Sequence, residues 1–181
     1  PSITHAGDYV FRNRISGTNE AKYIAKIAKK KGFKRVAVAA INNEAGVPYI
    51  DIFQSNFDKL GGNVVQRVLL APGSTDFRSH VIKLKNAKPD AVFLVLQIEQ
   101  AGQLLKQSTE LGFHPRWLGI SSLKSDALLK IAGHSAEGLI IASEGIDASN
   151  EQFLTFDKRY KARFAETPTI YAVNGYDAII L

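Results

Sequence analysis

The side chains that could take part in chemistry follow the ends of short apolar segments in this sequence. Most of them are amides and hydroxyls, which donate and accept hydrogen bonds but do little acid–base chemistry near neutral pH. Glu44 and Glu99 are candidates for a general base, but each stands where a helix is expected to begin, and a carboxylate there usually complements the helix dipole. The set therefore predicts a binding site rather than a catalytic one. Its members are Asn42, Asn43, Glu44 and Ala45, then residues 71–74, then Gln97, Ile98 and Glu99, then Ser121 and Ser122, and finally Ser143 and Glu144.

Motifs for nucleotides, metals and nucleophilic catalysis are absent from the sequence. The turn "INNEAG" (41–46) lacks the glycine spacing of a dinucleotide site, and neither a Walker loop nor a G-x-S-x-G elbow occurs. The four histidines are far apart in sequence and there is no cysteine, so no metal-ligand spacing is found. We therefore expect no catalytic residue, no metal site and no cofactor.

Composition indicates a globular protein. Apolar residues make up 45% and charged residues 22% of the 181 residues, and no apolar run approaches the roughly 20 residues of a transmembrane helix. The net charge of +6 is spread along the chain. Its densest group is at 29–35, at a helix end where cations are favoured by the dipole, so we expect a solvated face and no nucleic-acid partner. The chain begins at Pro1, has no methionine and stops at Leu181 inside an apolar pattern; we expect an excised piece of a longer protein.

The order of elements predicts an α/β fold. Apolar segments alternate with amphipathic ones, which is typical of parallel strands joined by right-handed helical crossovers. We expect a doubly wound, flavodoxin-like sheet of about five strands in the order 2-1-3-4-5, with helices on both faces. Thr75 or Asp76 is the expected N-cap of the helix after the second strand. The expected strands are 35–41, 63–70, 88–96, 116–120 and 138–143.

Three segments are expected. Residues 1–33 would hold a crossover strand, "YVFRN", and the first helix of the lobe. Residues 34–143 would form the doubly wound lobe. Residues 144–181 would hold a return crossover and C-terminal helices, truncated, with Pro168 between two helical stretches.

Several motifs in sequence order resemble one family. Together they are similar to the periplasmic binding proteins of the leucine/isoleucine/valine-binding type, the solute receptors of branched-chain amino-acid ABC transporters. The resemblance covers nearly the whole chain, and "TDF…K…PDAV" and "Y…GYDA" contribute most to it. The motifs are "DYVFRN", "KRVAVAAINNEAG", "STDFRSHVIKLKNAKPDAVFLVLQIEQAGQLLKQSTELGF", "AGHSAEGLIIAS" and "PTIYAVNGYDAIIL".

The resemblance implies two α/β lobes, joined by three crossovers, that close over a small solute. It places Pro1 in the first crossover, residues 34–143 as the second lobe and Leu181 within a helix of the first-lobe region, so that the first lobe of the same protein is mostly missing. The implied partners are a small-molecule solute and the membrane permease of an ABC transporter. The implied location is periplasmic or extracellular, in a precursor with a signal peptide.

The resemblance also implies four ligand contacts. The turn after the first strand often supplies an aromatic, and Ala45 stands there. The third strand often ends in a tyrosine, and Gln97 stands there. The loop after the fourth strand supplies amino-acid binders with a carboxylate for the ligand ammonium; here it is Ser121, which favours a solute without a buried ammonium. Tyr171 matches an aromatic that lines the cleft from the hinge side.

Each of these residues has a structural alternative. Gln97 and Ser121 could be solvated turn residues, and Tyr171 could pack between helices. Asn43 and Ser122 are expected behind the ligand contacts. Asn42 and Asn43 could instead cap the next helix or hold its turn.

Two other classes of function remain open from the sequence. The same bilobal fold serves as the ligand-binding domain of receptors or transcriptional regulators. A flavodoxin-like enzyme would bind a nucleotide or show pH-dependent activity, and neither is expected.

Overall fold

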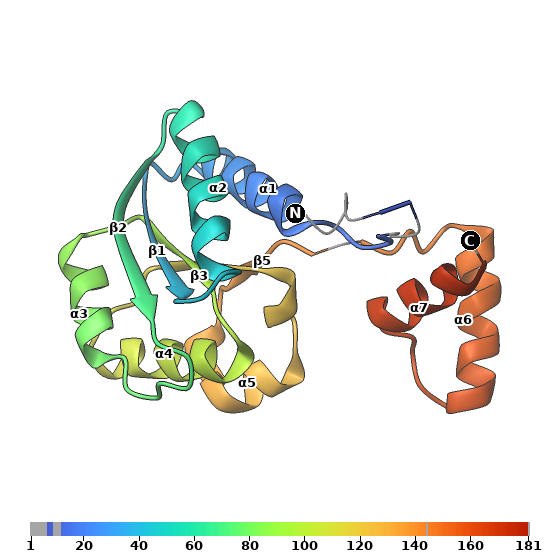
Figure 1. Cartoon of the computed structure of the whole chain (residues 1–181). Helices are drawn as coiled ribbons and strands as arrows, with labels where there is room; N and C mark the ends of the chain where they lie inside the picture. The colour runs from blue at the N-terminus through green and yellow to red at the C-terminus, as the bar shows by residue number, and fades with distance from the viewer. Residues whose placement is uncertain (1–6, 9–11, 144, 181) are drawn as a thin grey trace. The chain divides into compact units, whose positions relative to one another are not determined.

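A five-stranded parallel sheet organises residues 17–143 (Figure 1). The computed structural model describes residues 7–8, 12–143 and 145–180. The elements of this unit, which we call the lobe, are α1 (Gly17–Lys30), β1 (Arg35–Ile41), α2 (Gly46–Lys59), β2 (Asn63–Leu70), α3 (Arg78–Asn86), β3 (Ala91–Val95), α4 (Ile98–Glu110), β4 (Arg116–Gly119), the 3₁₀ turn η2 (Ser121–Leu123), α5 (Asp126–Ala132), the 3₁₀ turn η3 (Gly133–Ala136) and β5 (Ile140–Ile141).

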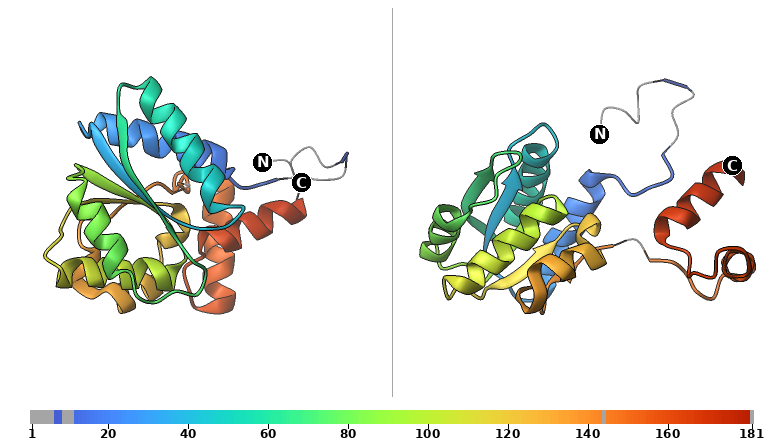
Figure 2. Two further views of the ribbon diagram at one scale, coloured as in Figure 1. Left: turned by 60° about the vertical axis from the view of Figure 1, so that its left-hand side comes forward. Right: turned by 90° about the horizontal axis from the view of Figure 1, so that it is seen from below.

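The sheet separates two apolar cores because successive side chains of a strand point to opposite faces. In β1, Ala37 and Ala39 belong to the core under α3, α4 and α5, whereas Val36 and Val38 belong to the core under α1 and α2. Six of its seven residues are buried, as a strand covered on both faces requires. Figures 1 and 2 show the two helical layers.

The strand order is β2-β1-β3-β4-β5, and all four pairings are parallel. This confirms the predicted doubly wound, flavodoxin-like α/β fold. From β1 the chain passes to β2 on one side and then to β3 on the other, so the winding reverses between β1 and β3. Such a switch point opens a crevice at the carboxyl ends of the two strands.

The third strand is shorter than the predicted 88–96. Lys88 has a left-handed backbone conformation (φ 47°), so it cannot pair as a strand residue. The Asp90 carboxylate accepts hydrogen bonds from the backbone N–H groups of Lys34 (2.7 Å) and Arg35 (2.9 Å), and these bonds lower the pKa of Asp90. Strand pairing therefore begins only at Ala91.

Other predicted boundaries also change. The fourth strand ends at Gly119 instead of residue 120. The fifth covers Ile140–Ile141 instead of 138–143, because Gly138 makes a left-handed turn (φ 76°) just before it. Neither Thr75 nor Asp76 is the N-cap of α3: that position is Phe77, whose side chain is buried.

Two buried glutamines of α4 hold the loop before α3. Gln107 Oε1 accepts from the backbone N–H of Phe77 (2.6 Å), and its Nε2 donates to the carbonyl of Thr75 (2.7 Å). Gln100 Nε2 donates to the carbonyl of Ala71 (3.0 Å). The amides satisfy loop backbone groups that would be costly to bury unpaired.

The second compact unit consists of Pro1–Ser16 and Glu144–Leu181. Its helices are α6 (Glu151–Phe164) and α7 (Ile170–Ile180), which confirms two helical stretches on either side of Pro168. Asn150 caps α6 by accepting from the N–H groups of Gln152 and Phe153. In the predicted strand "YVFRN", residues 9–11 lie outside the described residues, and Arg12 and Asn13 are not in a strand.

Candidate functional site

A pocket of about 550 Å³ lies at the carboxyl ends of β1 and β3 in the lobe. It is at the switch point of the sheet, where open α/β folds bind ligands. The first turns of α2 and α4 and the segment after β4 complete its wall, so that residues from three separate stretches of sequence meet. The pocket is lined by Ile41, Asn43, Ala45, Gly46, Tyr49, Val95, Leu96, Gln97, Ile98, Glu99, Ile120 and Ser122.

The turn between β1 and α2 is held by Asn43. Its side-chain oxygen accepts from the backbone N–H groups of Ala45 (3.0 Å) and Gly46 (2.8 Å), which confirms that Asn43 holds the turn. Gly46 packs against the end of β1 so closely that a Cβ atom there would lie 2.1 Å from the Ile41 carbonyl oxygen. The turn therefore requires a glycine at this position to bring α2 against the sheet.

The start of α4 forms the opposite wall. Gln97 occupies the N-cap position of α4 with an exposed side chain that makes no capping hydrogen bond. Ile98 and Glu99 follow in the first turn, where the carboxylate complements the helix dipole. Glu99 is the one charged residue among the described residues that line the pocket, so this wall offers an amide, an apolar side chain and one carboxylate.

Ser121 and Ser122 begin the 3₁₀ turn after β4, and their positions differ. Ser122 is exposed and lines the pocket. Ser121 does not line it; its backbone N–H donates to Glu20 Oε1. Glu20 comes from α1 and is only 7% exposed. A carboxylate therefore lies beside position 121 although the residue itself carries none.

Tyr49 supplies the ring in the pocket wall. Its hydroxyl donates to Glu20 Oε2, and its ring centroid lies 6.5 Å from that of Phe93. Burial, then the hydrogen bond and the charge of Glu20, raise the pKa of Tyr49 far above its ordinary value. The phenol therefore stays protonated at neutral pH and remains a donor to Glu20.

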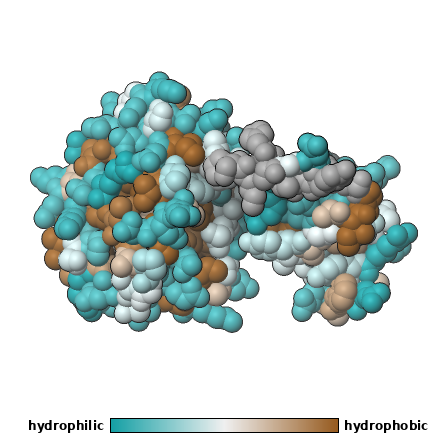
Figure 3. All heavy atoms as spheres, in the orientation of Figure 1, coloured by the Kyte–Doolittle hydropathy of each residue, from teal (hydrophilic) through white to brown (hydrophobic). Residues whose placement is uncertain are grey.

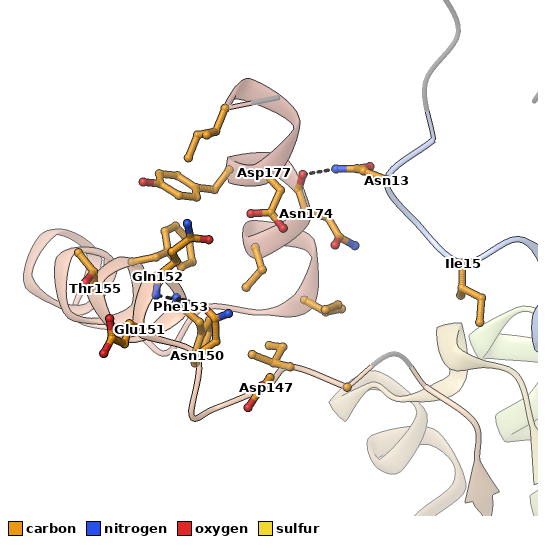
Figure 4. A pocket seen from close by; sticks show the side chains of 17 residues that line it. Asn13, Ile15, Asp147, Asn150, Glu151, Gln152, Phe153, Thr155, Asn174 and Asp177 are labelled. Carbon is orange, nitrogen blue, oxygen red and sulfur yellow. Dashed lines mark hydrogen bonds between the residues drawn. The ribbon is translucent and has the colours of Figure 1, made fainter.

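Tyr171 belongs to the second unit. Its ring is 57% exposed, and the Arg14 guanidinium carbon lies 4.8 Å from the ring centroid, a cation–π geometry. Tyr171 is therefore not buried within this chain, and both its contact with a ligand and its packing between helices stay predictions. Within the same unit, α6, α7 and the segments 13–15 and 145–147 surround a pocket of about 810 Å³ (Figure 4), beside which Asn13 Nδ2 donates to the carbonyl of Asn174.

Four of the six predicted site residues thus meet in one pocket: Asn43, Ala45, Gln97 and Ser122. Their contact with a ligand stays a prediction, as do the roles of Ser121 and Tyr171. Sequence reasoning missed Tyr49 and Glu20. The four-residue spacing of Tyr49 from Ala45 on one helix was a usable signal, but nothing near Glu20 in sequence pointed to the pocket.

Neither a metal-ligand cluster nor a membrane-spanning helix is found among the described residues. Over residues 7–8, 12–143 and 145–180, no group of three or more histidine or acidic side chains is arranged to hold a metal ion. No helix in those ranges combines the length and apolar character needed to cross a membrane.

Comparison with known proteins points to one family. The sequence profile of the family described as periplasmic binding protein matches residues 3–181. The Leu/Ile/Val-binding protein of Citrobacter freundii is 30% identical over 125 residues, which cover 69% of this chain and 33% of that protein.

Solved structures agree with the family match. A leucine-binding protein of Thermotoga maritima superposes with a TM-score of 0.89 at 26% identity, covering 98% of this chain and 51% of that one. A solute-binding protein of an ABC transporter from Rhodopseudomonas palustris BisB5, in complex with 3,4-dihydroxybenzoic acid, gives a TM-score of 0.76 at 27% identity and covers 98% and 50%.

The chain spans a third of the length of the Citrobacter relative and about half the length of these two solved proteins. Within that span, the family profile, the strand order and the switch-point pocket agree with one another. The chain therefore belongs to the periplasmic binding protein family.

Proposed function

We propose that residues 1–181 form the second lobe and the adjoining crossovers of a solute-binding protein. The complete protein captures a small solute between two lobes in the periplasm or outside the cell and presents it to the membrane permease of an ABC transporter. The family consists of solute-binding proteins rather than enzymes. The ligand stabilises the closed form by contacting both lobes, and no covalent chemistry is involved.

The observation that supports this proposal best is the pocket at the switch point of the lobe. Half of its twelve lining residues are aliphatic, and the others include one tyrosine ring, neutral polar groups from Asn43, Gln97 and Ser122, and the carboxylate of Glu99. A small-molecule site of this kind binds an apolar body and uses a few polar groups for orientation. The solute therefore turns its apolar portion toward this lobe.

Two chemical classes of solute fit the proposal. The Citrobacter relative is named for leucine, isoleucine and valine, and the Rhodopseudomonas structure contains a hydroxylated benzoic acid. Both kinds of molecule join an apolar body to a carboxylate. Because position 121 carries a serine, we favour a small carboxylate without an ammonium group, such as an aromatic acid.

The second unit carries the surface on which the first lobe would pack. None of the residues of α7 is buried in this chain, although most of them are apolar. Apolar residues appear at the surface of this unit in Figure 3. Burying such side chains against the rest of the protein would stabilise it in proportion to the area covered. In this unit, the most exposed large apolar residues that the structure describes are Leu154, Phe164, Tyr171, Ile179 and Ile180.

A thermal-shift screen of the complete protein tests the proposal. We expect benzoate or 4-hydroxybenzoate to raise the melting temperature more than L-leucine does, because the serine at position 121 offers no carboxylate to the ammonium of leucine. A ligand that binds only the folded state stabilises it by about 2.7 kcal/mol at a hundred times its Kd, so the tighter binder gives the larger shift. A larger shift with L-leucine would contradict the preference for a solute without an ammonium. No shift with any amino acid, aromatic acid or small carboxylate would contradict solute capture itself.

A further inference from the structure

Tyr49 stands where it can replace the aromatic group missing at Ala45. Ala45 is the N-cap residue of α2 and Tyr49 follows four positions later in its first turns, so they lie on the same side of the helix, and both line the pocket. Ala45 is exposed and contributes only a methyl group, whereas Tyr49 presents part of a phenol ring. The aromatic wall of the pocket is therefore one helical turn further along α2 than the resemblance suggested.

The ring of Tyr49 is held on several sides. Phe93 lies beside it from β3, and the first residue of α1 lies close to its edge: a Cβ atom at Gly17 would come within 2.6 Å of Tyr49 Cε2. The hydroxyl is anchored to Glu20. A ring fixed in this way loses little conformational freedom when a ligand packs against it.

Glu20 connects two walls of the pocket. One carboxylate oxygen accepts from the Tyr49 hydroxyl on α2, and the other accepts from the backbone N–H of Ser121, next to the pocket residue Ser122. Since Glu20 is buried and does not itself line the pocket, its carboxylate supports the wall from behind.

We infer that Tyr49 is the aromatic contact for the solute in this lobe and that Glu20 is the positioning residue that fixes both Tyr49 and the turn at Ser121. The inference rests on the proposed function, and it deepens that function by assigning the solute a flat apolar portion that packs on the Tyr49 ring. The hydroxyl of Tyr49 serves Glu20, so the solute meets the ring rather than a hydrogen-bond donor.

The test compares variants of the complete protein by calorimetry with benzoate and L-leucine as probes. We expect Tyr49→Leu to weaken the better probe about tenfold and Tyr49→Phe, which keeps the ring, by less than about threefold. Tyr23→Leu is the matched control, because Tyr23 is an exposed tyrosine of α1 outside the pocket. The affinity of this variant for the probe should equal that of the unchanged protein. Unchanged affinity in Tyr49→Leu would overturn the aromatic contact.

The role of Glu20 is tested separately. Glu20→Ala should weaken binding about fivefold and speed amide hydrogen exchange at Ser121. Glu20→Gln should restore both, because its amide oxygen can accept from the Ser121 N–H while its amide N–H donates to the Tyr49 hydroxyl oxygen, which can act as an acceptor. If Glu20→Gln instead abolishes binding of L-leucine and preserves that of benzoate, Glu20 pairs with the ligand ammonium and the positioning role is wrong.

Failure of the proposed function gives a different pattern. If the unchanged protein binds neither probe, nor any other solute of the thermal-shift screen, solute capture fails and the aromatic contact fails with it. Hydrogen exchange at Ser121 needs no ligand, so it still decides the positioning role: unchanged exchange in Glu20→Ala overturns it, and faster exchange supports it.

Discussion

Replacing Phe93 with alanine is expected to destabilise the lobe by about 3–5 kcal/mol, the usual cost of removing a fully buried aromatic ring. Phe93 lies in the middle of β3 with no exposed surface. Its ring centroid is 4.7 Å from that of Phe53 and 6.5 Å from that of Tyr49. The substitution therefore leaves a cavity under α2 and removes support from the pocket wall. Urea denaturation of residues 1–181 measures the change.

The control for Phe93→Ala is Ile82→Ala on α3. Ile82 is 48% exposed, so its truncation should cost less than about 1 kcal/mol. A loss at Phe93 as small as the loss at Ile82 would contradict the tight packing between β3 and α2.

Replacing Gly46 with alanine is expected to lower stability by about 1–3 kcal/mol and to weaken solute binding by the complete protein more than tenfold. The new methyl group would meet the carbonyl oxygen of Ile41 at 2.1 Å and the Ile41 side chain at 3.0 Å. Backbone cannot give way as a flexible side chain can, so the first turn of α2 must move away from β1. That movement displaces Ala45 and Tyr49 together. Urea denaturation and calorimetry with the better-binding probe measure the two effects.

Gly175→Ala makes the same chemical change in an open environment. Gly175 is in α7, and a Cβ atom there would meet nothing within 4 Å. Alanine favours helix over glycine by up to about 1 kcal/mol, so in residues 1–181 this variant should be as stable as the original or slightly more stable. If Gly46→Ala behaves like Gly175→Ala, the close approach of α2 to β1 is not needed for the pocket.

The fold was predictable because apolar periodicity reports burial directly. The continuous apolar stretch at β1 could only be a strand covered on both faces, and the helical stripes between strands implied crossovers, which led to the observed strand order. Strand ends were less predictable. Pairing at β3 starts at Ala91, and Asp90 just before it bonds through its carboxylate to the backbone of Lys34 and Arg35, which are more than fifty positions away in sequence.

The site was predictable only where strand ends mark it. Asn43, Ala45, Gln97 and Ser122 follow β1, β3 and β4 directly, so the topology alone brought them together. Glu20 could not be found in this way. It is on α1, 101 residues before Ser121, and reaches the pocket wall only because α1 packs beside α2.

Calorimetric titration of the complete protein and of residues 1–181, side by side with benzoate and L-leucine, tests the two-lobe account most directly. We predict that the complete protein binds one probe with a micromolar or lower Kd, which corresponds to a binding free energy of about −8 kcal/mol. Residues 1–181 should bind the same probe at least about a hundredfold more weakly, because they lack the ligand contacts of the first lobe. Equal affinity in the two proteins would contradict capture between lobes and would place the whole site in the lobe described above.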